Sequence, residues 1–322
     1  MNAHESNAVS AAACLQSPAP RIPQRRRERS RWTPPEQHTA GARPPLSALA
    51  VIGDWGPRWA VICARWQDVL PTLPAGSVQH AIFDPPYSEH VHSKSRAGAR
   101  KVPLRDGNGR ISRCAFQREA TFGFDPITMG EMELLSDHLD RVVQRWSLAF
   151  CDVESVHLWR GAMVSAGLSY KRCCSWEKIG ATPQFSGDRP GVGFEAIVCA
   201  HQPGRSRWNG GGKLGVYHHI TCIERGGKST ENDSREHPTQ KPLPLMIELI
   251  EDFTDPGDII LDSTAGSGTT GVAAIRTGRR AILIERSWEW ASVARERMEA
   301  EGSSSSLRAR RAGQLSLLEA AR

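Results

Sequence analysis

The stretch Asp262-Ser263-Thr264-Ala265-Gly266-Ser267-Gly268-Thr269-Thr270-Gly271 decides the fold of this 322-residue chain. It follows an apolar run, Ile259 to Leu261, that predicts a buried strand, and it leads into Val272 to Ile275, which predicts a helix. A Gly-x-Gly-x-x-Gly loop between a strand and a helix lets the backbone approach a ligand and lets the helix pack closely on the sheet. The loop therefore predicts a nucleoside cofactor. Its candidate binding residues are Asp262, Thr264, Ala265, Gly266, Ser267, Gly268, Thr269 and Thr270.

The strand after this loop supports the same ligand class. The run Ala281 to Ile284 predicts a strand that ends in Glu285, at about the distance where an acidic residue meets ribose hydroxyls. A nicotinamide enzyme would share this half of the pattern. However, only 37 residues follow Glu285, too few for a second mononucleotide half. The missing strands must lie upstream, which argues against a dehydrogenase.

A second signature, Asp84-Pro85-Pro86-Tyr87, closes the predicted strand Val78 to Phe83. It combines a carboxylate, two prolines that fix the backbone, and an aromatic ring, which together suit a flat, amine-bearing group. Taken alone, the same residues are also typical of a rigid turn after a strand.

The rest of the chain alternates between strand and helix patterns, which predicts an α/β fold with a mostly parallel sheet. The further predicted strands are Trp59 to Ala64, Leu148 to Cys151, Tyr170 to Lys178 and Ala196 to Ala200. The predicted helices are Asp68 to Leu73 (short), Thr128 to Trp146, Ser155 to Ala166 and Leu245 to Phe253.

Three segments, Phe83 to Tyr87, His237 to Pro242 and Leu261 to Thr270, together resemble the beta-group (permuted) amino-methyltransferase family of site-specific DNA methyltransferases, DPPY type. The resemblance covers roughly Val51 to Met298. It implies a Rossmann-like S-adenosylmethionine-dependent methyltransferase fold with helices on both faces of the sheet and a circularly permuted motif order. It also implies S-adenosyl-L-methionine as the cofactor and double-stranded DNA as the partner.

The resemblance assigns roles to individual residues. Asp84, Pro85, Pro86 and Tyr87 would be catalytic, with Asp84 and the Pro85 carbonyl accepting the two N–H bonds of a flipped base that stacks on Tyr87. Further cofactor contacts would be Thr239, Gln240, Lys241 and Glu285.

The target base follows from the first motif residue. Asp at the position of Asp84 is commoner in the family's adenine N6 enzymes, so we expect adenine; a cytosine N4 enzyme and a catalytically silent DNA-binding protein remain alternatives. One residue departs from the family: Arg65 stands where an acid near the adenine of the cofactor is usual, so that either Asp68 substitutes for it or that contact is absent.

Basic residues are unevenly distributed along a chain of net charge +6. Between Lys94 and Arg118 there are eight Lys or Arg and one acid, so we expect residues 88–125 to form a basic DNA-facing loop, unless it is merely a solvated loop. Residues 201–236 mix rings, glycines and cations and are a candidate target-recognition insert, unless the rings pack on the core. The candidate DNA-binding residues are Lys94, Arg96, Arg100, Lys101, Arg105, Arg207 and Lys213.

Composition excludes several classes of protein. No apolar run approaches the roughly 18 residues of a membrane span, and the N-terminus has no signal-peptide core. The eight cysteines contain no Cys-x-x-Cys pair, so we expect neither zinc nor disulfides, and no metal. We therefore expect a cytoplasmic, nucleoid-associated protein encoded by a bacterium or a phage.

The expected domains are a disordered basic arm (1–46), the methyltransferase domain (47–300) and a flexible tail (301–322). In the tail, Gln314 to Leu318 resembles the peptide by which bacterial proteins dock on the replicative sliding clamp, although a stray amphipathic turn is an alternative.

Overall fold

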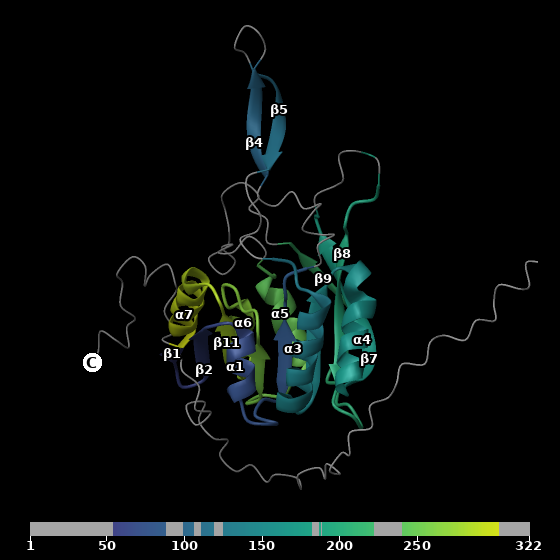
Figure 1. The fold of residues 1–322 in the computed structure, drawn as a ribbon, viewed down its shortest axis with the longest axis vertical. Coiled ribbons are helices and arrows are strands. Elements are labelled where there is room, and N and C mark those ends of the chain that lie inside the picture. Colours follow the sequence, from purple (N-terminus) through teal and green to yellow (C-terminus); the bar gives the residue numbers. More distant parts are fainter. Residues whose placement is uncertain are drawn as a thin grey trace, which may run out of the picture. The chain divides into compact units, whose positions relative to one another are not determined.

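A nine-stranded mixed sheet organises the protein (Figure 1). The computed structural model describes residues 54–87, 99–105, 111–118, 125–181, 187, 189–221 and 240–302. The sheet order is β1-β2-β11-β10-β3-β6-β8-β7-β9. The strands are β1 (Asp54–Trp55), β2 (Trp59–Cys63), β3 (His80–Phe83), β6 (Trp146–Cys151), β7 (Ser169–Ile179), β8 (Phe194–His201), β9 (Val216–Ile220), β10 (Ile259–Asp262) and β11 (Arg280–Glu285).

The centre of the sheet is parallel, as the alternating pattern predicts. Strands β2, β11, β10, β3 and β6 pair in parallel, whereas β1 runs antiparallel to β2. Strand β8 is antiparallel to both β6 and β7, and β9 is parallel to β7. Because β8 alone is reversed in this part of the sheet, its first residues lie at the edge where the parallel strands end.

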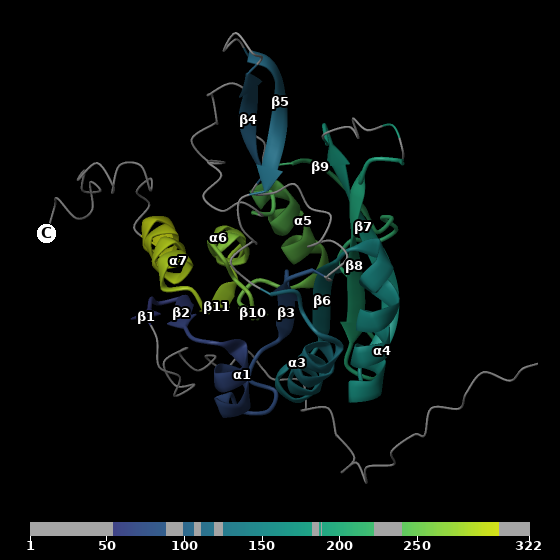
Figure 2. The same cartoon turned by 45° about the horizontal axis from the view of Figure 1, so that its top comes forward.

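Helices cover both faces of the sheet, as the family resemblance implies (Figure 2). Helices α1 (Trp66–Val69), α3 (Met129–Val142) and α4 (Val156–Ala166) cover one face, and α5 (Leu243–Phe253), α6 (Thr269–Arg276) and α7 (Trp288–Gly302) cover the other. Short 3-10 turns, η2 (Leu70–Thr72) and η3 (Val153–Ser155), adjoin α1 and α4.

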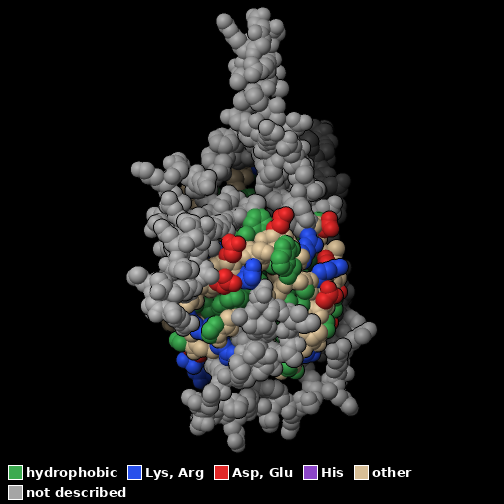
Figure 3. Space-filling view, turned by 90° about the vertical axis from the view of Figure 1, so that its left-hand side faces the viewer, with side chains coloured by type: hydrophobic (Ala, Val, Ile, Leu, Met, Phe, Trp, Pro, Cys, Tyr) green, Lys and Arg blue, Asp and Glu red, His purple; other side chains and the backbone are tan. Residues whose placement is uncertain are grey.

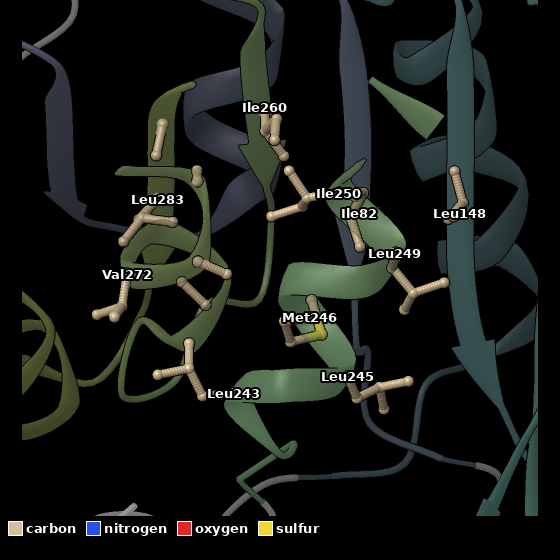
Figure 4. Packing of buried hydrophobic residues seen from close by; sticks show 14 of the residues in the cluster. Ile82, Leu148, Leu243, Leu245, Met246, Leu249, Ile250, Ile260, Val272 and Leu283 are labelled. Carbon is tan, nitrogen blue, oxygen red and sulfur yellow. The ribbon is translucent and has the colours of Figure 1, made fainter. Parts of the chain in front are cut away.

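Side chains of β3 alternate between the two cores, as strand geometry requires. Ala81 and Phe83 join the core under α3 and α4, whereas Ile82 joins the core under α5 and α6. Figure 4 shows Ile82 with the leucines and Met246 of α5 beside the neighbouring strands. Burial on both faces explains why the central strands are continuous apolar runs.

Helix α3 is shorter than the sequence predicts. It begins after a capping box, in which the Thr128 hydroxyl accepts from the backbone N–H of Glu131 and the Glu131 carboxylate accepts from the backbone N–H of Thr128. It ends at Val142 rather than at Trp146, because Val143 is extended and bridges to Val78, and Trp146 already begins β6.

Four strands, β1, β4 (Ala99–Arg105), β5 (Ile111–Arg118) and β9, have no counterpart among the predicted ones. Strand β1 is short, and β9 lies inside the candidate insert 201–236. Within the predicted loop 88–125, β4 and β5 pair antiparallel, so this part is a hairpin and not a loop. Charged residues have low strand propensity, which explains why the pattern reads as a loop.

Figure 3 shows one face of the molecule, on which the described residues carry both charges. On that face, acidic, basic and apolar side chains lie next to one another. In the described ranges, no helix is long and apolar enough to cross a membrane.

Candidate active site

The two signature segments lie at the same edge of the sheet. Strands β3 and β10 are parallel neighbours, with Ile260 opposite His80 and Leu261 opposite Ala81. Asp84 follows the carboxyl end of β3, and the glycine loop follows the carboxyl end of β10. In open α/β sheets this edge is where ligands bind.

Backbone geometry explains the glycines of the loop. Gly266 and Gly268 have φ values of 51° and 80°, in the region that favours glycine. A Cβ at Gly268 would also lie 2.9 Å from the Cβ of Ala294 in α7. The glycine therefore permits both the turn and the close approach of α7.

Asp262, the last residue of β10, is buried and holds the glycine loop through two hydrogen bonds. Its Oδ1 accepts from the backbone N–H of Thr264 at 3.0 Å, and its Oδ2 accepts from the Thr270 hydroxyl at 2.5 Å. Burial raises the pKa of Asp262 to about 7, although the Thr270 and Thr264 hydrogen bonds oppose the rise.

Glu285, at the end of β11, holds the other side of the loop. Its Oε2 accepts from the N–H of Gly266 at 2.9 Å, and its Oε1 accepts from the N–H of Ser287 at 2.8 Å. Because each carboxylate oxygen has a second lone pair and the side chain is half-buried, Glu285 can still accept from a ligand hydroxyl.

Ser267 links the loop to two distant segments. Its hydroxyl donates to Gln240 Oε1 at 3.2 Å, which brings the second predicted cofactor segment to the loop. Arg297 of α7 donates to the Ser267 carbonyl and hydroxyl at 2.7 and 3.0 Å. Sequence reasoning missed Arg297, since a buried arginine in a charged helix has no distinguishing pattern.

Lys241 lies with the Asp-Pro-Pro-Tyr motif. Its ammonium donates to Asp84 Oδ2 at 2.6 Å and to the Tyr87 hydroxyl at 3.2 Å. The side chain is 8% exposed, so the ion pair with Asp84 is shielded from water. The sequence groups Lys241 with the cofactor contacts, whereas its ammonium contacts Asp84 and Tyr87 of the catalytic motif.

Glu195, the second residue of β8, completes this cluster and was missed by sequence reasoning. Its Oε2 accepts from the Tyr87 hydroxyl at 2.5 Å and lies 3.1 Å from the Lys241 ammonium, while its Oε1 pairs with Lys178 at 2.6 Å. Burial raises the pKa of Glu195, but the two lysines outweigh it and lower the pKa to about 2. Only the reversed direction of β8, which the sequence does not reveal, brings Glu195 to this edge.

Three buried oxygens at this edge have no hydrogen-bond partner among the described residues: Asp84 Oδ1, Ser263 Oγ and Thr264 Oγ1. Buried polar atoms are nearly always paired, so these three suit a polar ligand at the ends of β3 and β10. Burial raises the pKa of Asp84, and the neighbouring Lys241 ammonium opposes that rise. Pro85 is buried and Pro86 half-buried behind this carboxylate.

The described candidate DNA-binding residues do not gather at this site. Arg207 pairs with Asp255 at 3.2 Å, near the amino end of β10 and thus at the opposite edge of the sheet. Lys213 pairs with Glu248 and Asp252 at 2.5 and 2.7 Å.

Aromatic residues of the candidate insert pack on α5. The ring of Trp208 meets Phe253 edge to face at 4.8 Å, and Tyr217 is fully buried with its hydroxyl on Asp252. For these two rings, the structure therefore supports the alternative that they pack on the core of the protein. Arg65 and Asp68, at the start of α1, are both exposed.

Some predicted residues fall outside what the structure describes. Lys94, Arg96 and Thr239 lie outside the described residues, as do the whole arm 1–46 and most of the tail, including Gln314 to Leu318. For Arg100, Lys101 and Arg105 only the backbone, in β4, is described.

Comparison with known proteins adds independent evidence. A family model described as DNA methylase matches residues 139–296. The type II methyltransferase M2.DpnII of Streptococcus pneumoniae is 50% identical over 74 residues, which are 23% of this chain and 28% of that protein. The chain thus spans less than a third of the length of this curated relative.

Solved structures share the fold over a longer range. The M1.HpyAVI complex with SAM has a TM-score of 0.52 and 22% identity, covering 75% of this chain and 98% of that one. The cytosine-N4-specific PvuII DNA methyltransferase has a TM-score of 0.55 and 13% identity, covering 74% and 86%. The match to the DNA methylase model over residues 139–296 and the shared fold agree with the resemblance that the three signature segments carry.

Proposed function

We propose that this protein transfers a methyl group from S-adenosylmethionine to the exocyclic amine of a base in double-stranded DNA. The observation that carries the proposal is the position of Asp84, whose unpaired Oδ1 lies at the end of the strand next to the glycine loop. An amine acceptor and a nucleoside loop on adjoining strands suit group transfer between the two ligands.

The residues of the glycine loop fit S-adenosylmethionine. Glu285 would accept from the ribose hydroxyls, Gly266 to Gly268 would allow close backbone approach, and the unpaired Ser263 and Thr264 hydroxyls would meet polar groups of the ligand. When bound, S-adenosylmethionine supplies a methyl group on positively charged sulfur, and the C–S electron pair remains on sulfur as the amine nitrogen takes the methyl. Gln240 and Lys241 stand beside the same edge and complete our proposed set.

Asp84 makes the amine nucleophilic. An exocyclic amine is a weak nucleophile because its lone pair is delocalised into the ring. By accepting one N–H, while the Pro85 carbonyl accepts the other, the carboxylate draws that lone pair back onto nitrogen. The nitrogen then releases a proton, for which Asp84 is the nearest base. Tyr87 offers its ring to the flipped base.

We infer adenine N6 as the target, because the resemblance associates Asp at the position of Asp84 with adenine. Cytosine N4 is the alternative. We further propose that the domain spans residues 47–300 and that the basic residues of β4 and the preceding segment contact phosphates. The tail would dock on the sliding clamp; equal clamp binding with and without residues 313–322 would refute this last part.

Labelled methyl transfer to mixed DNA tests the activity, and sequencing of DNA from an expressing host identifies the base and site. Asp84→Ala should abolish transfer while S-adenosylmethionine binding, measured by calorimetry, stays within about threefold of wild type. If wild-type protein binds DNA but incorporates no label under several conditions, the protein is a catalytically silent DNA-binding protein instead.

A further inference from the structure

The cluster around Asp84 gives its two carboxylate oxygens different roles. Oδ2 is held by the Lys241 ammonium at 2.6 Å, whereas Oδ1 is buried and has no partner among the described residues. Asp84 therefore has one oxygen fixed by the protein and one free to accept.

A second carboxylate holds Lys241 in place. Glu195 Oε2 lies 3.1 Å from the ammonium, and its Oε1 is tied to Lys178 at 2.6 Å. The same Oε2 accepts from the Tyr87 hydroxyl, so one residue fixes both the lysine and the ring on which a base would stack.

The charges around Asp84 act in opposite directions. Burial and the Glu195 carboxylate favour the protonated form of Asp84. The Lys241 ammonium and hydrogen bonding by Tyr87 favour its ionised form. Cys151 of β6 and Asp262 of β10 also face Asp84. Lys178 acts on Asp84 through Glu195. Among the described residues, Lys241 is the one cation that pairs directly with the Asp84 carboxylate.

We propose that Lys241, anchored by Glu195, is a positioning residue that pins Asp84 Oδ2 and keeps the carboxylate ionised, so that Oδ1 is free to accept the amino group of the base. This rests on the proposed methyl transfer. Because Oδ2 accepts from Lys241, a protonated Asp84 would carry its hydrogen on Oδ1, which would then donate rather than accept and would not draw the amine lone pair onto nitrogen. Lys241 thus sets the lower pH limit of the reaction without touching the base.

Two substitutions should move that limit in opposite directions. Lys241→Met removes the cation, so the pKa of Asp84 rises by about one unit or more and the acid limb of kcat moves up equally. At pH values below the wild-type acid limb the rate then falls by about tenfold for a one-unit shift, and it recovers at higher pH. Glu195→Gln removes an anion that raises the pKa of Asp84, so its acid limb moves to lower pH. Lys241→Arg should restore the wild-type limb.

Lys171→Met is the matched control, because Lys171 on β7 donates to the Gly204 carbonyl at an exposed position and forms no ion pair with Asp84 or Glu195. Its pH profile should equal that of wild type. A purely structural role for Lys241 would instead lower the rate by the same factor at every pH, and that result would overturn the proposal. If Lys241→Met does not fold, as judged by thermal unfolding, a Glu195→Gln limb that is unmoved or moves up overturns it equally.

A measurement independent of turnover separates this inference from the proposed function. The ¹³C resonance of the Asp84 carboxyl, assigned with Asp84→Asn, titrates in wild type, Lys241→Met and Glu195→Gln without DNA or cofactor. Opposite shifts in the two variants support the role of Lys241 even if no methyl transfer is found, which would defeat the proposed function alone. An Asp84 pKa that is unchanged in Lys241→Met overturns the inference even if the enzyme is active.

Discussion

At the scale of single residues, the site contains buried carboxylates whose surroundings shift their pKa values in opposite directions. Glu195, with two lysines, has its pKa lowered to about 2, whereas Asp262, with only neutral donors, has its pKa raised to about 7. Buried carboxylates of such different basicity are typical of functional sites. The sequence identifies Asp84 and Asp262 because they stand in recognisable motifs, but it does not identify Glu195, which stands in none.

Asp262 should make stability depend on pH. Its pKa is about 7 in the folded state and near 4 when unfolded, so the folded protein binds the extra proton between these values. That stabilisation is complete below about pH 4 and is lost as the pH rises through about 7. We expect wild type to lose about 2 to 3 kcal/mol of unfolding free energy between pH 5 and pH 8 relative to Asp262→Asn.

Urea unfolding of both proteins at several pH values measures this difference. Asn keeps an acceptor for the Thr264 N–H and has no charge to bury, which makes it the appropriate reference. Parallel stability curves for the two proteins would contradict the assignment of the pH dependence to Asp262.

At the scale of elements, strand and helix positions were predictable where apolar periodicity is strong, as in β10, α6 and β11. Boundaries that depend on pairing were not. Helix α3 ends before Trp146 because that residue already belongs to β6. No local sequence pattern predicts this boundary. The reversed β8 is likewise set by its neighbours in the sheet rather than by its own residues.

The turn into α6 should be intolerant of a side chain. Gly268→Ala would place a Cβ 2.9 Å from the Cβ of Ala294 at a φ of +80°, so we expect a loss of about 1 to 3 kcal/mol in unfolding free energy and weaker cofactor binding. Gly161→Ala in α4 is the control, since its Cβ would meet nothing within 4 Å; there we expect a change of about 1 kcal/mol or less, in the stabilising direction. Equal effects in the two variants would refute the steric argument.

The start of α3 offers a second test at this scale. Thr128→Ala removes the acceptor for the Glu131 N–H and should cost about 1 kcal/mol in urea unfolding. Thr128→Ser keeps the hydroxyl and should remain within about 0.5 kcal/mol of wild type. A serine variant as unstable as the alanine variant would show that the methyl group, and not the cap, matters.

At the scale of the whole molecule, the order of the motifs was the most informative feature of the sequence. It requires that the strand before Asp84 and the strand before the glycine loop lie together although they are far apart in the chain, and β3 and β10 are direct neighbours. The positions of the candidate DNA contacts could not be derived from the order of the motifs. Arg207, for example, forms an ion pair with Asp255, and no sequence pattern predicts that pair.

Because the strand that ends before Asp84 pairs directly with the strand that leads into the proposed cofactor loop, a bound cofactor product should stabilise the molecule as one unit. S-adenosylhomocysteine at about 100 times its Kd should add about 2.7 kcal/mol to the unfolding free energy and raise Tm in a single transition. The Gly268→Ala protein should respond less at the same concentration. Two transitions, of which only one responds to the ligand, would contradict this expectation.

The pairing of β3 with β10 also governs when this protein can fold during synthesis. Strand β3 gains its first parallel neighbour when β6 emerges from the ribosome, through pairs such as Ile82 with Leu148. The other edge of β3 can pair only after residues 259–262, which form β10, have been synthesised. For that interval an apolar strand edge has no native partner, and such an edge attracts other chains. The permuted order therefore lengthens the interval in which this edge is open to mispairing during synthesis.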